Sequence, residues 1–155
     1  FKEHYMKIHL TVEQPCKNGY VWASPENTDL KASEFYNCWE YCMEEECTHL
    51  YAPTILEIFR TNEIEEILPK WGSLIRKDGK ITLGGTDLYL LSRMAIRRGK
   101  DLGTLNDILF QKPYAVQSIT SSESTVKFLR TMGFKITNIE LDDNNCTYVV
   151  EGIKV

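Results

Sequence analysis

The central third of the chain changes from a helical to a strand pattern of hydrophobic positions. Residues 63–77 carry apolar side chains at spacings of three and four, which predicts a helix with one buried stripe made of Ile64, Ile67, Trp71 and Ile75. Gly79 suits the left-handed position just past the end of such a helix. The apolar run Lys80–Leu83 is too short for a second helix after that turn, so it predicts a strand.

The same patterns predict the other elements on both sides of this segment. Thr120 and Glu123 fit a capping box at the start of a helix that Gly133 ends. Residues 37–46 fit either a short helix or a covering loop. Together the patterns predict strands at Lys7–Val12, Gly19–Ala23 and Cys47–Ala52, a short strand within Leu30–Phe35, a helix at Asp87–Arg98, and a closing hairpin of Phe134–Leu141 and Cys146–Val155 around Asp142–Asn145.

This order of elements predicts an α/β fold. A helix that returns through a short turn into a strand is half of a crossover unit. We therefore expect a mostly parallel sheet with Lys7–Val12 and Cys47–Ala52 adjacent at its centre. Because the carboxyl ends of such strands bind ligands in open α/β sheets, we expect the functional site at that edge.

Three segments resemble the class I S-adenosylmethionine-dependent methyltransferases. Met6–Val21 is similar to the abbreviated opening of short members, Thr48–Phe59 to their fourth strand and the segment after it, and Ile75–Lys80 to the turn before their fifth strand. The resemblance covers most of the chain, and it is to a short, partly degenerate member of phage or bacterial type. It implies a three-layer Rossmann-like methyltransferase sheet, mostly parallel, with an antiparallel C-terminal hairpin strand beside the fifth strand.

The resemblance also implies where a cofactor and a base would lie. Asp87 ends the fifth strand and is the candidate catalytic base, while an aspartate there also suits the cap of the next helix. Glu57 matches an acid of the family pattern, but Ile58 stands where the family has a histidine. The residues implied to bind S-adenosylmethionine lie at the carboxyl ends of the strands and are Thr11, Val12, Glu13, Ser24, Glu26, Tyr51, Ala52, Thr54, Gly84, Gly85 and Thr86.

Two departures from the family pattern leave a second function open. The loop after the first strand has no glycine before Gly19, whereas family members usually use glycine there so that the cofactor can approach the backbone. Ser24 stands where the second strand normally ends in an acid that binds the ribose. The expected function is a methyltransferase acting on an unidentified small molecule or sugar. The alternative is a non-catalytic methyltransferase-like binding or assembly protein.

The net charge and the absence of certain motifs argue against several classes of function. The formal net charge of −4 argues against a nucleic-acid partner, because polyphosphate affinity comes mainly from clustered Lys and Arg. The sequence has neither a nucleophile with a credible base nor a phosphate-binding loop, so hydrolase and kinase functions are not expected. A local basic cluster fits either a solvated helix face or a site for an anionic substrate or partner, and consists of Arg93, Arg97, Arg98 and Lys100.

The five cysteines do not indicate a metal site. Their odd number, without a secretory signal, predicts reduced thiols. Cys38, Cys42, Cys47 and His49 lack the paired spacing of structural zinc sites. We therefore expect no metal, with Cys47 packed as a small hydrophobic residue and His49 facing a neighbour in its strand.

Length and hydrophobicity fit one compact domain. The chain has 155 residues, of which 43% are hydrophobic. We take residues 6–155 as a single domain and Phe1–Tyr5, before a candidate initiator Met6, as a vector remnant or an upstream extension. No apolar run approaches the roughly 20 residues of a membrane span. We thus expect a cytoplasmic protein with a small-molecule substrate, no membrane partner and no nucleic-acid partner.

Overall fold

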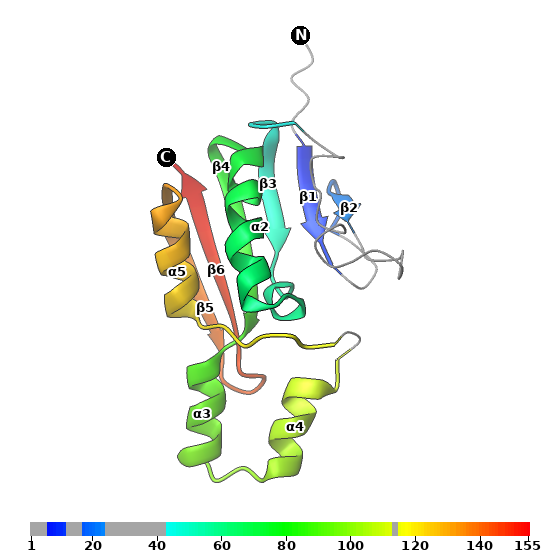
Figure 1. Cartoon of the computed structure of the whole chain (residues 1–155), viewed down its shortest axis with the longest axis vertical. Coiled ribbons are helices and arrows are strands. Elements are labelled where there is room, and N and C mark those ends of the chain that lie inside the picture. The colour runs from blue at the N-terminus through cyan, green and yellow to red at the C-terminus, as the bar shows by residue number, and fades with distance from the viewer. Residues whose placement is uncertain (1–5, 12–16, 24–42, 113–114) are drawn as a thin grey trace.

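The computed structural model describes residues 6–11, 17–23, 43–112 and 115–155, which form one six-stranded sheet (Figure 1). The strand order is β2-β1-β3-β4-β6-β5. The strands are β1 (Met6–Leu10), β2 (Val21–Ala23), β3 (Cys47–Ala52), β4 (Ile75–Thr86), β5 (Phe134–Asp142) and β6 (Thr147–Lys154).

The pairing of the strands confirms the predicted topology. β1 lies between β2 and β3 and is parallel to both, and β3 is parallel to β4. The final strand, β6, is antiparallel and is inserted between β4 and β5. The short strand predicted within Leu30–Phe35 and most of the ambiguous segment 37–46 lie outside the described residues.

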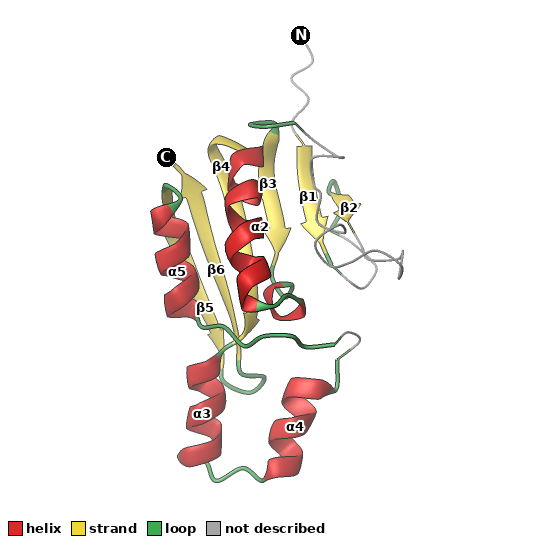
Figure 2. Ribbon diagram, viewed as in Figure 1, coloured by secondary structure: helices red, strands yellow, loops and turns green. Residues whose placement is uncertain are grey.

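Four α-helices and one short 3₁₀ helix are described. Figure 2 shows α2 and α5 along the sheet, whereas α3 and α4 form a hairpin beyond the end toward which the parallel strands point. The elements are η2 (Leu56–Ile58), α2 (Thr61–Leu74), α3 (Leu88–Ile96), α4 (Leu102–Phe110) and α5 (Ser122–Thr131).

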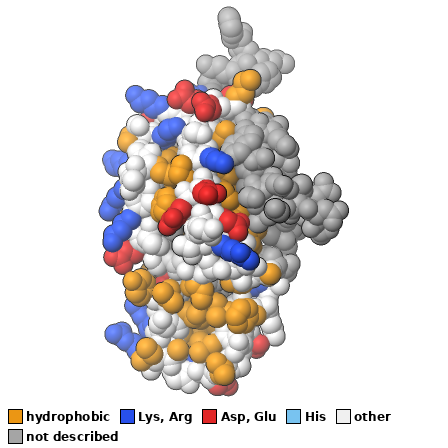
Figure 3. Space-filling model, in the orientation of Figure 1, with side chains coloured by type: hydrophobic (Ala, Val, Ile, Leu, Met, Phe, Trp, Pro, Cys, Tyr) orange, Lys and Arg blue, Asp and Glu red, His pale blue; other side chains and the backbone are white. Residues whose placement is uncertain are grey.

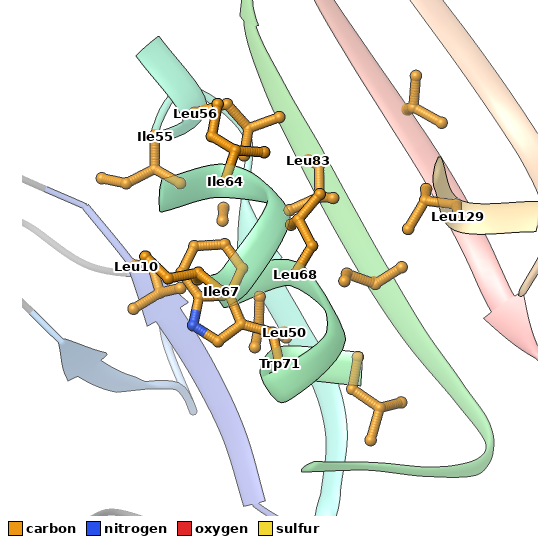
Figure 4. Packing of buried hydrophobic residues seen from close by; sticks show 14 of the residues in the cluster. Leu10, Leu50, Ile55, Leu56, Ile64, Ile67, Leu68, Trp71, Leu83 and Leu129 are labelled. Carbon is orange, nitrogen blue, oxygen red and sulfur yellow. The ribbon is translucent and has the colours of Figure 1, made fainter. Parts of the chain in front are cut away.

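The core lies between the sheet and helix α2. The predicted apolar stripe of this helix is buried, with Trp71 fully enclosed. Figure 4 shows the stripe packed over one face of the sheet, where it lies against Leu10 of β1, Leu50 of β3 and Leu83 of β4. The apolar side chains that recur every 3.6 residues in the helix and every 2 residues in the strands therefore pack into one cluster.

The junction between α2 and β4 differs from the prediction. The helix ends at Leu74 rather than at residue 77, and Asp78, not Gly79, has a positive φ of 68°. The strand begins at once because Ile75 already pairs with Cys47, and the next pair is Lys80 with His49, so residues 76–79 form a bulge. A Cβ on Gly79 would lie 2.7 Å from Cγ2 of Ile75, which explains glycine at that position.

The start of α5 also differs from the prediction. Its cap is Ser121 in a capping box with Ser124, rather than the expected Thr120 with Glu123. Thr120 instead lies 2.6 Å from the Tyr148 hydroxyl, which joins the start of α5 to the sheet. The end of the helix is as predicted, because Gly133 has a φ of 87°.

Candidate functional site

A hollow of about 510 Å³ lies at the carboxyl ends of β3 and β4. The sheet side is formed by Thr54, Glu57 and Thr147, and the opposite side by helix α4 and the residues just after it. The side chains that line it are mostly polar and are Thr54, Glu57, Thr104, Asp107, Ile108, Gln111, Lys112, Asn145 and Thr147. Its position at this edge agrees with the sequence expectation for a ligand site.

Three residues from distant parts of the chain form a buried polar cluster in the wall of this hollow. Nζ of Lys112 lies 2.6 Å from each carboxylate oxygen of Glu57 and 2.7 Å from Oγ1 of Thr86. The Thr86 hydroxyl donates to Oε2 of Glu57 at 2.5 Å. Glu57 is only 1% exposed, so its charge is balanced inside the protein by the ammonium group.

Local structure explains how Glu57 is held in this position. It lies in η2, which begins four residues after the last residue of β3. Its carbonyl oxygen accepts hydrogen bonds from the backbone N–H groups of Gln117 and Ser118, at 2.7 and 3.3 Å. The segment that leads to α5 therefore holds the backbone of η2 against the edge of the sheet, while Lys112 and Thr86 hold the Glu57 carboxylate.

Asp87, the acid that the sequence indicates as a catalytic base, is a helix cap in this structure. Its Oδ1 accepts hydrogen bonds from the N–H groups of Tyr89 and Leu90, and its Oδ2 accepts one from Ser122. The residue is 2% exposed and does not line the hollow. Asp87 thus joins the starts of α3 and α5, which is the capping role that the sequence left open.

The two glycines at the end of β4 have different surroundings. A Cβ on Gly84 would lie 2.1 Å from the carbonyl oxygen of Pro53 and 2.4 Å from that of Tyr148. A Cβ on Gly85 would lie 3.6 Å from the backbone nitrogen of Glu57, an ordinary contact distance. Glycine at 84 is therefore explained by close backbone packing within the protein.

The other residues implied to bind a cofactor are only partly described. Tyr51 and Ala52 end β3, Thr54 lines the hollow, and Thr11 directly follows β1. Thr86 ends β4 inside the buried cluster. Val12, Glu13, Ser24 and Glu26 lie outside the described residues.

The sheet face on which His49 lies carries a cluster of aromatic and cationic groups. Nδ1 of His49 lies 2.6 Å from the Tyr20 hydroxyl, and its Nε2 lies 2.8 Å from Oγ1 of Thr82. The His49 ring also meets that of Tyr51 in the same strand, edge to face, with centroids 5.6 Å apart. Burial is the largest cause that lowers the pKa of His49, to about 4, while Glu151 opposes it.

The described residues contain no group of three or more His, Cys, Asp or Glu side chains arranged to hold a metal ion. Cys47 is buried in the hydrophobic core. Its packing as a small hydrophobic residue is confirmed. Cys38 and Cys42 lie outside the described residues.

Solved structures identify the fold. A methyltransferase from Archaeoglobus fulgidus matches 95% of this chain and 75% of its own, with a TM-score of 0.59 and 11% identity. One from Mesorhizobium loti matches 97% of this chain and 81% of its own, with a TM-score of 0.57 and 10% identity. This chain has the Rossmann-like methyltransferase fold.

A third structure with the same fold has a more specific name. It is magnesium protoporphyrin IX methyltransferase from Synechocystis, solved with bound SAH, and it matches with a TM-score of 0.52 and 13% identity. The match covers 89% of this chain, which spans about half (52%) of that enzyme. No family model matches the sequence, and no curated protein is detectably similar to it.

Lys112 is the site residue that the sequence does not reveal. It follows α4 in a polar stretch, 55 positions after Glu57, and nothing in the local pattern distinguishes it from a solvated lysine. Glu57 is different, because the resemblance already marks it as an acid of the family pattern. To find Lys112 from the sequence, one would have to know which cation pairs with Glu57 in the folded protein.

Proposed function

We propose that this protein binds S-adenosylmethionine at the carboxyl edge of its sheet and transfers the methyl group to a small molecule or sugar in the adjoining hollow. The observation that carries the proposal is the hollow beside buried Glu57, which is lined mostly by residues with polar side chains and lies at the edge of a sheet with methyltransferase strand order. Ligands of open α/β sheets bind at this edge.

The described residues at this edge partly fit such a cofactor. Thr54 brings a hydroxyl to the hollow and Thr11 follows the neighbouring β1, so both suit polar groups of the ligand. Gly84 and Gly85 are enclosed by the protein, so they would shape the site through the backbone. The remaining contacts in the proposal fall to Val12, Glu13, Ser24 and Glu26. The cofactor, when bound, supplies an electrophilic methyl group on a sulfonium.

Positioning supplies most of the catalysis in a direct methyl transfer, so the chain needs few chemical groups. A hydroxyl acceptor must lose its proton, and we assign that proton to Glu57 rather than to Asp87. Glu57 reaches the hollow, whereas the carboxylate oxygens of Asp87 accept three backbone N–H groups. Lys112 and Thr86 would keep the Glu57 carboxylate oriented.

The non-catalytic alternative is supported by one observation. The carboxylates of both Glu57 and Asp87 are already engaged by partners within the protein. A protein that has kept the fold for binding or assembly would retain such contacts for stability. Binding of the cofactor separates this alternative from the enzyme.

Calorimetric titration with S-adenosylmethionine and S-adenosylhomocysteine tests the proposal. We expect weak binding of both, because Val12 and Glu13 replace glycine in the first loop. Thr54→Trp places a large side chain at the hollow and should weaken binding by about tenfold or more, equivalent to about 1.4 kcal/mol. Thr137→Trp, on exposed β5 away from the hollow, is the matched control and should bind as wild type.

The outcomes decide between the two functions. Wild-type binding that Thr54→Trp reduces, together with transfer of a tritiated methyl group to a small-molecule acceptor, supports the enzyme. An absence of binding at millimolar ligand would favour the non-catalytic protein. Equal binding by Thr54→Trp and wild type would contradict the proposed contact between Thr54 and the cofactor.

A further inference from the structure

The α3–α4 hairpin ends in a tip, residues 96–102, that exposes large apolar side chains. Ile96 is 81% exposed and Leu102 is 76% exposed, the highest values among the large hydrophobic residues that the structure describes. Figure 1 shows the tip at the far end of the molecule, beyond the carboxyl end of the sheet. The two residues therefore project where the rest of the described chain does not cover them.

Three cations lie between these two apolar residues. Arg97, Arg98 and Lys100 are all exposed, and Arg93 adds a fourth on the last turn of α3. Residues 88–111 carry four basic and two acidic side chains, a net charge of +2 in a chain of −4. One of the acids, Asp101, caps α4 by accepting from the backbone N–H of Thr104. The tip is thus a cationic and apolar end of an otherwise acidic protein.

The apolar surface continues from the tip along the hairpin. α4 has no buried residue, although Leu105 and Ile108 pack partly against Leu90, Met94 and Cys146. Figure 3 shows hydrophobic side chains gathered over this end of the molecule, with basic side chains at its margin. Between the helices lies a hollow of about 260 Å³ lined mainly by apolar side chains, which are Leu91, Ala95, Leu102, Leu105 and Leu109.

We propose that this tip docks onto the surface of a bilayer that contains anionic lipid. Exposed apolar side chains bordered by Arg and Lys match the boundary between acyl chains and anionic headgroups, where each type finds its preferred surroundings. Two copies of the chain meeting tip to tip would instead bring Arg97 and Arg98 of each copy together. Nucleic acid would leave Ile96 and Leu102 without apolar contacts.

This contact is a surface contact and not a membrane span. No described helix has the length and apolar character needed to cross a bilayer. The absence of a long apolar run in the sequence predicts that the chain does not span a membrane, but this criterion does not apply to contact with a membrane surface. The proposal is also independent of the proposed function, because residues 96–102 contribute no lining residue to the hollow at Glu57.

Co-sedimentation with vesicles tests the proposal. The full chain should bind phosphatidylcholine vesicles that contain about one-third phosphatidylserine, and binding should fall steeply between about 0.1 M and about 1 M salt. Ile96→Ser/Leu102→Ser and Arg97→Gln/Arg98→Gln should each weaken binding by about tenfold or more. Because these side chains are exposed, both variants should keep the thermal stability of the wild type.

Matched controls separate the tip from general surface effects. Leu141→Ser removes an apolar side chain that is 56% exposed on β5, and Lys127→Gln/Arg130→Gln removes two exposed cations from α5. Both should bind vesicles as wild type does. Three results would overturn the proposal: no binding to the anionic vesicles, unchanged binding by either tip variant, or a dimer in analytical ultracentrifugation that the tip variants dissociate.

Discussion

Lys112 and Glu57 lie 55 positions apart in the chain, yet Nζ of the lysine is 2.6 Å from both carboxylate oxygens of the glutamate. The pair joins the end of α4 to η2 at the edge of the sheet. Because both side chains are largely shielded from water, the charge of each is balanced mainly by the other. Each group therefore depends on the other, and that dependence can be measured.

Removing one member of the pair should destabilise the protein strongly. Lys112→Met leaves a buried carboxylate without its cation, at an expected cost of about 3–5 kcal/mol in the free energy of unfolding. Glu57→Gln/Lys112→Met removes both charges and should cost clearly less than the sum of the two single changes. Urea unfolding of the three variants measures this coupling.

The exposed ion pair between Lys80 and Glu151 is the matched control. Its closest nitrogen–oxygen distance is 3.5 Å, and the lysine side chain is 48% exposed. Lys80→Met should change the free energy of unfolding by less than about 1 kcal/mol. Equal losses for Lys112→Met and Lys80→Met would contradict the importance of burial at Glu57.

Asp87 should matter for stability as a helix cap. Asp87→Ala removes the acceptor of three backbone N–H groups at the starts of α3 and α5, and we expect a loss of about 2 kcal/mol. Asp101→Ala, which removes the exposed cap of α4, should cost less. Thermal unfolding compares the two. A smaller loss for Asp87→Ala than for Asp101→Ala would show that the buried cap is not the stronger one.

The two glycines of β4 should respond very differently to alanine. Gly84→Ala would force a Cβ to within 2.1 Å of the Pro53 carbonyl oxygen, and a backbone atom cannot easily move away. We expect a loss of more than about 3 kcal/mol or failure to fold. Gly85→Ala meets only contacts of 3.6 Å or longer and should fold normally. Soluble yield and circular dichroism of both variants provide the comparison.

His49 should make stability depend on pH. Burial lowers its pKa to about 4 in the folded protein, whereas the unfolded chain has a value near 6.5. Between these pH values the unfolded state binds a proton that the folded state does not, so the free energy of unfolding falls as the pH falls from about 6.5 to about 4. Above that range, and below it, His49 adds no further dependence.

Urea unfolding at several pH values measures this effect. His49→Gln should show a shallower fall in the same range. Burial also lowers the pKa of His9, so part of the slope should remain in that variant. Identical slopes for His49→Gln and wild type would contradict a neutral, half-buried His49.

The resemblance together with the local patterns predicted most of the strand order. The short run Lys80–Leu83 and the turn at Asp142–Asn145 depend on neighbours close in the chain, so the prediction located β6 and part of β4. The observed β4 begins five residues earlier, at Ile75. The helix that precedes β4 was predicted to end at residue 77, three residues after its observed end at Leu74. Its end is set by pairing of Ile75 with Cys47, a contact that no local pattern contains.

The sequence by itself determined most of the elements, although it indicated no helix at α4 (Leu102–Phe110). With the family resemblance, it also predicted the parallel order of β1, β3 and β4. Hydrophobic period and turn chemistry are local properties, so they can be read along the chain. Only the tertiary structure decided that Lys112 meets Glu57, that Asp87 joins two helices, and that the α3–α4 tip is uncovered. Each of these features depends on how segments that lie far apart in the sequence pack against one another, and a local sequence pattern does not contain that information.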